Sequence, residues 1–386
     1  MDFSLNDDQL ALQAAAQAFA AGELAPHAAH WDEESLFPKD TLRQAGEMGF
    51  CGIYTPEVYG GLALSRLDAS IIFEALSAGC TSTTAYLTIH NMATWMIASW
   101  AQREVAEQWV PGMVAGELLG SYCLTEPGNG SDAAALKTSA TLDGDGYRLN
   151  GSKMFISGGG ESDVLVVMAR TGGPGAKGIS AFVVAADSPG ISYGRKESKM
   201  GWNSQPTRAI TFEDVHVPAR QRLGEEGEGF RIAMKGLDGG RLNIASCSVG
   251  TAQAALDAAC SYVKGRQQFG QAIMDFQITQ FKLADMLTEL IAARQMVRLA
   301  ACKLDAGDVD ATAYCAMAKR FATDVGFKVC NEALQLFGGY GYIREYPLER
   351  MVRDTRVHQI LEGSNEIMRV IVGRALQDEA VLARLR

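Results

Sequence analysis

The chain has 386 residues, of which 47% are hydrophobic, and its formal net charge is −10 at pH 7. A chain of this length can bury a large core and is expected to divide into two or three domains. The negative charge argues against nucleic acid or an anionic membrane as the main partner, because both select for clustered lysine and arginine.

The cysteines and histidines give no pattern typical of a metal site or a disulfide frame. The eight cysteines are scattered without a C-x-x-C pair, and the five histidines show no ligand spacing. We therefore expect reduced, mostly buried thiols and no structural or catalytic metal.

The start of the chain and its longest uncharged run bear on location. Residues 1–4 include neither a basic region nor an apolar segment, and the uncharged run 75–102 contains many polar residues. We therefore expect no targeting peptide, no membrane span and a cytoplasmic location. A mature organellar protein that had lost its presequence would give the same pattern.

In chain order, residues 1–118 are predicted to be helical. Asn6 followed by Gln9 is typical of an N-terminal capping box, and an apolar stripe with many alanines follows. From residue 119 to residue 225 the hydrophobic period changes to two, which predicts strands, with a hairpin turn at Asp143–Gly146. The clearest strands are the β-branched runs Val164–Met168, Ile179–Val184 and Ala209–Phe212.

From residue 226 to residue 386 the pattern returns to long alanine-rich helices. One of them is expected to run from about Ala322 to the glycine pair Gly338–Gly339. Helices, then strands, then helices, without βα alternation, exclude a doubly wound parallel sheet and predict an α+β protein that is mostly α. The segment Gly173–Gly178 fits G-x-G-x-x-G, but a strand follows it, so we interpret it as a surface hairpin and not as a phosphate loop.

An acidic residue, Glu362, stands on a short break just before a predicted helix. Gly363 frees the backbone, and Ser364 is a good N-cap for the helical run that follows. A carboxylate aimed by the backbone in this way could act as a base. The alternative is an acidic residue near a helix N-terminus that only benefits from the helix dipole.

Two other segments are candidates for ligand contact. Tyr122–Asp132 combines glycines, which let backbone N–H groups approach a flat or anionic ligand, with the hydroxyl groups of Thr125 and Ser131. A turn-rich linker is the alternative for this segment. Gln335–Tyr342 has a glycine pair followed by aromatic residues, which a helix C-cap and a turn would also explain.

In this order and at this spacing, the three segments resemble the acyl-CoA dehydrogenase family of flavoproteins. The resemblance covers the whole chain and includes Phe3–Gln9, Asn150–Ser157 and Arg266–Gly270. It implies the family's three domains, in which a barrel-like β domain lies between an N-terminal helical domain and a C-terminal four-helix bundle. The corresponding boundaries in this chain are 1–118, 119–225 and 226–386.

Within the family, three segments look most like the isobutyryl-CoA dehydrogenases, the valine-pathway branch. These segments are Gly158–Asp163, Gly201–Arg208 and Val357–Glu366. The resemblance therefore implies a dehydrogenase for a small branched acyl-CoA, with isobutyryl-CoA the first candidate.

The resemblance implies bound FAD, because taking a hydride from an unactivated carbon needs an electron sink that no side chain supplies. It places Thr125 on the pyrimidine edge of the flavin and Ser157 near N5. The family more often has Trp and Thr where this chain has Phe155 and Ser157, so an altered flavin environment is expected. The implied contacts from this part of the site are Tyr122, Cys123, Leu124, Thr125, Gly130, Ser131, Phe155, Ile156, Ser157, Ser364 and Glu366.

The pyrophosphate and adenosine end of FAD would be bound by a neighbouring subunit of a homotetramer, the usual state in the family. Arg266 has the fork-shaped charge that suits phosphate, although taken alone it is a solvated arginine at a helix end. Glu366 stands where straight-chain members commonly have Gln. The residues implied at this end are Arg266, Gln268, Phe269, Phe276, Gln277, Gln335, Gly338 and Gly339.

The CoA ester is implied to lie against Ser131, Asp238, Arg241 and Gly363. Asp238 and Arg241 could equally form only a local ion pair at i, i+3 on one helix. Some members of the family carry their base on this helix, but this chain has Gly240 there, which leaves Glu362 as the candidate base.

The implied reaction is α,β-dehydrogenation of isobutyryl-CoA to methacrylyl-CoA. Glu362 would remove the α proton while the β hydride passes to flavin N5, and the backbone N–H of Glu362 with a flavin ribityl hydroxyl would stabilise the thioester oxygen. An apolar acyl chain over Glu362 would expel water and raise the pKa of its carboxyl towards neutrality. Electron-transfer flavoprotein would reoxidise the flavin.

Other functions share some of these motifs. A 2-methylbutanoyl-CoA or butanoyl-CoA dehydrogenase would differ only in the pocket lining. An acyl-CoA oxidase usually has a longer chain, and a nitroalkane oxidase has Asp where Glu362 stands. A DNA-associated flavoprotein of the same fold should have an added basic domain, which neither the length nor the charge of this chain supports.

Overall fold

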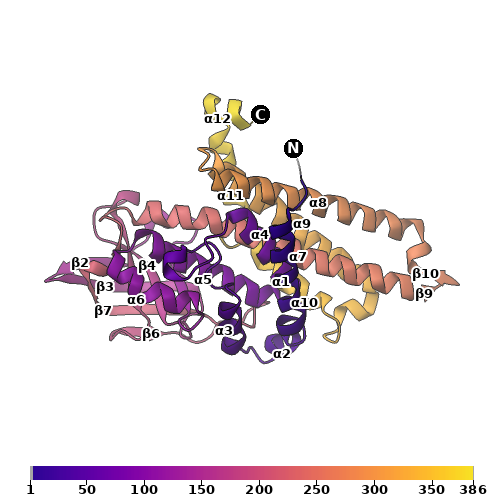
Figure 1. Ribbon diagram of the computed structural model, residues 1–386, viewed down its shortest axis with the longest axis horizontal. Coiled ribbons are helices and arrows are strands. Elements are labelled where there is room, and N and C mark those ends of the chain that lie inside the picture. Colours follow the sequence, from indigo (N-terminus) through magenta and orange to yellow (C-terminus); the bar gives the residue numbers. More distant parts are fainter. Residues whose placement is uncertain (1–2, 386) are drawn as a thin grey trace.

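The computed structural model describes residues 3–385 and shows helices at both ends of the chain with a sheet between them (Figure 1). The mixed α+β character predicted from the sequence is confirmed, and helices predominate. No helix of the described part of the chain is both long and apolar enough to cross a bilayer.

The first segment is helical, as predicted. Asn6 caps the first helix: its side chain accepts a hydrogen bond from the Gln9 N–H at 2.8 Å, and the Gln9 side chain accepts one from the Asn6 N–H at 3.2 Å. The predicted capping box is therefore confirmed. The helices are α1 (Asp7–Phe19), a π-helical turn (Ala20–Leu24), α2 (Ala28–Glu33), α3 (Lys39–Glu47), α4 (Arg66–Ser77), α5 (Thr81–Trp100) and α6 (Arg103–Val114).

The central segment forms one mixed sheet with the strand order β6-β7-β3-β2-β4-β5-β8, and β1 pairs in parallel with β4. The predicted hairpin joins β2 to β3, where Asp143 pairs with Gly146. The G-x-G-x-x-G segment lies between two strands, as we interpreted it. The strands are β1 (Gly120–Cys123), β2 (Ser139–Asp143), β3 (Gly146–Ser157), β4 (Val164–Arg170), β5 (Ile179–Ala185), β6 (Ile191–Tyr193), β7 (Thr207–Pro218) and β8 (Arg222–Leu223).

Strand β3 is irregular around Phe155, one of the predicted cofactor contacts. Its register against β7 shifts between Lys153 and Ile156, and Phe155 within this shift has a φ of 60°. Such a backbone angle is uncommon for a residue with a side chain. The irregularity leaves the Phe155 ring 62% exposed, while the neighbouring Ile156 is buried in the core of the sheet.

The last segment is again helical and is organised around the long helix α7. The helix predicted from about Ala322 begins earlier, at Ala311, because small residues such as Ala313 and Cys315 continue the buried helical face. The elements are α7 (Gly229–Gly265), β9 (Gln267–Gln268), β10 (Gln271–Ala272), α8 (Gln277–Asp305), α9 (Ala311–Phe337), α10 (Leu348–Arg356), α11 (Asn365–Ala375) and α12 (Glu379–Leu385).

Helix α7 also packs tightly against α4 of the N-terminal segment, and one glycine permits this contact. A Cβ at Gly250 would lie 1.9 Å from the backbone oxygen of Glu74, so the two helices could not keep their separation with any larger residue. This contact holds α7, which carries several candidate site residues, against the N-terminal helices.

We expect Gly250→Ala to lower the midpoint of thermal unfolding, because overpacking a helix contact against backbone atoms costs about 1 to 3 kcal/mol. Gly373→Ala is the matched control, since a Cβ there meets nothing within 4 Å in helix α11. The control should be neutral or slightly stabilising, because alanine favours a helix interior over glycine. Equal midpoints for Gly250→Ala and the wild type would contradict the packing argument.

Candidate active site

Glu362 lies on a turn between a 3-10 segment (Val357–Gln359) and helix α11. Its φ is 55° and that of Gly363 is 84°, so two successive residues adopt the left-handed conformation. The Ser364 side chain accepts a hydrogen bond from the Ile367 N–H, which confirms the predicted N-cap. The backbone therefore fixes the direction in which the carboxylate leaves the chain.

The carboxylate of Glu362 faces the first half of α7, at Gly240. A Cβ at Gly240 would lie 2.5 Å from Glu362 Oε2, so the helix backbone approaches the carboxylate directly. Within residues 3–385, Oε2 is buried and has no hydrogen-bond partner. Burial raises the pKa of the Glu362 carboxyl from its ordinary 4.5 to about 7, against the opposing charges of Arg241 and Lys319.

Arg241 joins the Glu362 turn to Asp238. Arg241 Nη1 donates to Asp238 Oδ1 at 2.6 Å, and the other carboxylate oxygen of Asp238 accepts a hydrogen bond from Thr312 Oγ1 at 2.7 Å. Arg241 Nε also approaches the backbone oxygen of Glu362 at 3.5 Å. The local ion pair that the sequence left open is thus present, and the structure brings this pair to the candidate base.

Tyr122, on β1, is a predicted cofactor residue that lies close enough to Glu362 for the charge of Glu362 to affect its pKa. Its hydroxyl is buried without a partner in the described chain, and its pKa is raised by burial and then by the charge of Glu362. The next two predicted residues, Cys123 and Leu124, point into separate hydrophobic cores, so only their backbones are available to a ligand.

The segments around Thr125 and Phe155 are joined directly. The Met154 N–H donates to the Thr125 oxygen at 2.8 Å, and the buried Lys153 donates from Nζ to the Leu124 oxygen at 3.1 Å and to Glu126 Oε1 at 2.9 Å. The buried Lys153–Glu126 ion pair was not predicted. The sequence contained one indication of this pair: Lys153 lies in a segment predicted to be a strand, on a face expected to be buried.

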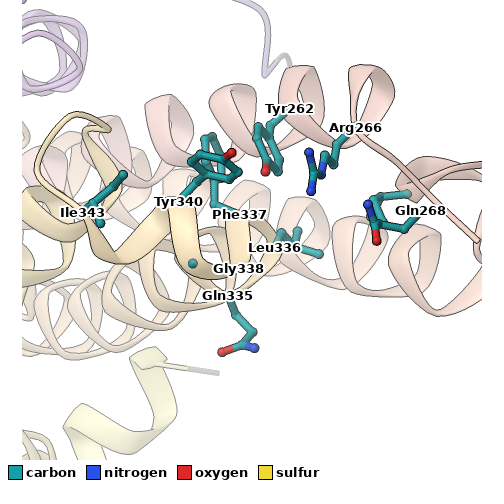
Figure 2. A pocket seen from close by; sticks show the side chains of 11 residues that line it. Tyr262, Arg266, Gln268, Gln335, Leu336, Phe337, Gly338, Tyr340 and Ile343 are labelled. Atoms are coloured by element: carbon teal, nitrogen blue, oxygen red, sulfur yellow. The ribbon is translucent and has the colours of Figure 1, made fainter.

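A second group of predicted residues gathers at the other end of α7, around a pocket of about 480 Å³. Figure 2 shows the rings of Tyr262, Phe337 and Tyr340 beside Arg266, while the Gln335 side chain is directed away from the Arg266 guanidinium. The pocket is lined by Tyr262, Arg266, Gln268, Ile273, Gln335, Leu336, Phe337, Gly338, Gly339, Tyr340 and Ile343. Five of the predicted residues are therefore together.

The remaining predicted residues lie outside both groups or at their edges. Phe269 is 94% exposed and packs edge-on against Phe276, with ring centroids 6.2 Å apart, and Gln277 begins α8 nearby. Ser131 lies on an exposed loop, and Glu366 is exposed at the start of α11. Their contacts to a ligand stay predictions.

The two groups cannot contact the same end of one ligand within one chain. Gly240 and Tyr262 are both in α7, and at 1.5 Å per residue they are separated by about 33 Å along the helix axis. Figure 1 shows the β9–β10 end far from the sheet.

Family comparisons agree with this architecture. The N-terminal, middle and C-terminal domain models of acyl-CoA dehydrogenase match residues 6–117, 121–215 and 227–377. The chain belongs to the acyl-CoA dehydrogenase family. As a member of it, the protein is an FAD-dependent oxidoreductase that acts on a CH–CH bond.

Close relatives span nearly the whole chain. It is 56% identical to the mitochondrial isobutyryl-CoA dehydrogenase of Bos taurus and 54% identical to that of Dictyostelium discoideum, with 97% of this chain and 90% of each relative covered. A solved chain from work on the electron transferring flavoprotein of Acidaminococcus fermentans is 42% identical, with a TM-score of 0.96 over 98% of this chain and 100% of that one.

The residues of this acyl-CoA dehydrogenase fit FAD at the positions that the sequence indicates. Phe155 offers an exposed aromatic face beside the Thr125 backbone, as a flat ring system requires. Tyr122 has a hydroxyl without a partner in the described residues. In the distant pocket, Arg266 has no carboxylate within ion-pair distance among residues 3–385, which leaves its charge available to a phosphate.

The raised pKa of Glu362 should be measurable as a change of stability with pH. A carboxyl whose pKa is higher in the folded state stabilises the fold below pH 4.5 and loses that contribution as pH rises through about 7. The loss is about 3 kcal/mol, at about 1.4 kcal/mol per pH unit. Glu362→Gln removes this dependence. Between pH 4.5 and pH 8.5 the free energy of unfolding of the variant should therefore increase relative to that of the wild type. Denaturant unfolding of both proteins across this range is the measurement, and parallel curves would contradict the assigned burial.

Proposed function

We propose that this enzyme oxidises isobutyryl-CoA to methacrylyl-CoA, with Glu362 as the base that removes the α proton. The observation that supports this most directly is the Glu362 carboxylate, which is withdrawn from water against Gly240 and has a pKa of about 7. A base with a pKa near the working pH is both sufficiently ionised and sufficiently basic to take a proton from carbon.

The residues around Glu362 suit the other requirements of the reaction. The Glu362 N–H has no acceptor within residues 3–385, so it is free to donate to the thioester oxygen as negative charge develops there. Arg241 and Asp238 would hold the CoA moiety, together with Ser131 and Gly363. An apolar acyl chain would exclude the remaining water from Glu362. Bound FAD supplies the acceptor for the hydride from the β carbon.

The choice of isobutyryl-CoA is supported by relatives rather than by pocket geometry. Both curated relatives at 54% and 56% identity are isobutyryl-CoA dehydrogenases. A hydrophobic pocket distinguishes one methylene by only about 1 to 3 kcal/mol, so 2-methylbutanoyl-CoA and butanoyl-CoA stay the alternative substrates. We further propose electron-transfer flavoprotein as the acceptor, a role in valine degradation and a cytoplasmic location.

We also propose that the active form is a homotetramer in which each FAD contacts two subunits. One chain holds the segments near Glu362 and the Arg266 pocket about 33 Å apart along α7, so a second copy is needed to bring them together. Helix α8 supports this, because it buries one face on α7 and α9 while Phe281, Ile291 and Leu299 stay exposed on its other side. In this proposal the boundaries 1–118, 119–225 and 226–386 divide the subunit into domains.

The reaction is tested by anaerobic titration of the FAD-loaded enzyme with acyl-CoA esters. Isobutyryl-CoA should bleach the flavin and should exceed hexanoyl-CoA and octanoyl-CoA in kcat/KM. Glu362→Gln should keep FAD and bind the CoA ester, yet reduce the flavin about 100 to 10,000-fold more slowly, as expected when a general base is removed. Near wild-type bleaching in this variant, or a preference for octanoyl-CoA, would contradict the assignment.

The shared cofactor site is tested through Arg266. Arg266→Ala should lower the FAD content and the stability of the tetramer together, because a ligand that binds across subunits stabilises their assembly. The measurements are flavin absorbance per chain and analytical ultracentrifugation with and without added FAD. Arg344→Ala is the control, since Arg344 is a cation of the same chain segment that does not line the pocket. A stable, colourless wild-type monomer would overturn the proposal.

A further inference from the structure

The turn that carries Glu362 requires support from its surroundings. Glu362 has a φ of 55°, a conformation that residues with a side chain rarely adopt, and Gly363 follows with 84°. Backbone conformations of this kind are strained and persist only where neighbouring groups hold them in place. The question is which side chains hold this turn.

Lys319, in the first half of helix α9, contacts the turn that carries Glu362. Its side chain is fully buried, and Nζ donates to the Gly363 backbone oxygen at 2.8 Å and to Asn365 Oδ1 at 2.9 Å. Asn365 is fixed in turn, because its Nδ2 donates to Asp324 Oδ1 at 2.8 Å. One ammonium group thus ties the second residue of the left-handed pair, Gly363, and the first residue of α11, Asn365, to helix α9.

A buried lysine normally has a carboxylate partner, and this one does not have one within ion-pair distance among residues 3–385. The cation on the other side of the turn, Arg241, is already paired with Asp238 and only approaches the Glu362 oxygen at 3.5 Å. Lys319 is therefore the buried cation whose charge is not used by another ion pair. Among the carboxylates around Lys319, Glu362 has the largest electrostatic effect on its pKa.

We propose that Lys319 is the positioning residue of the base: its ammonium group holds the Gly363 carbonyl, which keeps the left-handed turn in shape, and its charge stabilises ionised Glu362 in its largely buried site. This inference rests on the proposed role of Glu362. It assigns Lys319 no contact with substrate or cofactor.

The charges around the pair fix the sign of the effect. Burial lowers the pKa of Lys319 to about 8, while Glu362, Asp324 and Glu366 raise it and Arg241 lowers it. Lys319 in turn lowers the pKa of Glu362, as Arg241 does. Two buried tyrosines, Tyr54 and Tyr122, also feel the charge of Glu362; burial raises the pKa of both, so they stay neutral near pH 7. A further cation, Arg66, lies over the Tyr54 ring and beside Gly239, and the substitutions below leave it in place.

Removing the charge of Lys319 must therefore make Glu362 harder to ionise. For Lys319→Met we expect the pH midpoint of flavin reduction by isobutyryl-CoA to move upward by about one pH unit or more, as is usual when a nearby opposite charge is lost. The rate should fall most below the new midpoint and recover partly at high pH. A residue that only supported the fold would lower the rate equally at all pH values.

Lys199→Met is the matched control. Lys199 also has a pKa lowered to about 8 by burial and also donates to a backbone oxygen, that of Gln205, and to a side-chain oxygen, Thr207 Oγ1. It belongs to the segment before β7 and has no hydrogen bond to the Glu362 turn. Its loss should leave the pH midpoint unchanged, and an equal shift in this control would overturn the proposal.

A second readout does not depend on turnover. The carbonyl stretching band of protonated Glu362, obtained by infrared difference between the wild type and Glu362→Gln, should disappear near pH 7 in the wild type and at higher pH in Lys319→Met. Lys319→Arg, which keeps the charge, should keep the wild-type midpoint. If Lys319→Met does not fold, Lys319→Gln retains a donor and loses only the charge, and it should show the same upward shift.

The outcomes separate this inference from the proposed function. If Glu362→Gln still reduces the flavin, Glu362 is not the base and the proposed function fails first. If Glu362→Gln is inactive but neither Lys319→Met nor Lys319→Gln moves the midpoint or the infrared band, the proposed function stands and the role of Lys319 is overturned.

Discussion

The candidate active site depends on one carboxylate, that of Glu362, whose Oε2 atom is buried and has no hydrogen-bond partner within residues 3–385. Burial of an ionised carboxylate is costly unless it is compensated, so the surrounding groups decide whether it is ionised at neutral pH. Here the compensation comes from Arg241 and Lys319, two cations on different helices. Because α7 and α9 are the most extensively packed pair of helices, the positions of these cations follow from the core of the C-terminal segment. The proposed base, Glu362, lies on a short turn, but the pKa of its carboxyl depends on cations that the two long helices α7 and α9 supply.

A buried charge in the sheet is also compensated by neighbouring groups. The buried Lys153–Glu126 pair ties the loop after β1 to the irregular part of β3, and the Lys153 ammonium also binds the Leu124 oxygen. Both oxygens of the Glu126 carboxylate are satisfied, since they also accept from the Lys137 and Thr138 N–H groups. A buried pair satisfied in this way rigidifies its surroundings. It therefore fixes the Thr125 and Phe155 segments relative to each other, as the proposed contacts of both segments with one flavin require.

Local sequence patterns predicted the helices, strands and turns, but they did not predict the contacts between segments that are far apart in the chain. Asn6 with Gln9, Asp143–Gly146 and Ser364 are local signals, and each is where the sequence placed it. Glu362 was singled out from its local sequence, and Arg241 was selected through the family resemblance. Their proximity is a contact over more than a hundred residues that spacing alone does not reveal. Lys319 was missed for the same reason, because a single lysine in an alanine-rich helix is usually a solvated residue. Its burial depends on the turn that covers it, which is 44 positions away in the chain.

Gly240 shows why the proposed base can occupy only one of two positions, the turn or helix α7. A Cβ at this position would lie 2.5 Å from Glu362 Oε2, so any side chain there must displace the carboxylate that is now opposite. Glu362 and an acidic residue at position 240 would compete for one space, and each would also raise the pKa of the other. A chain with this backbone can therefore present its base from the turn or from the helix, but not from both. Because Lys319 and Arg241 lie beside the turn, the present arrangement favours ionisation of a carboxylate on the turn. A glycine at position 240 on α7 leaves the space that this carboxylate occupies.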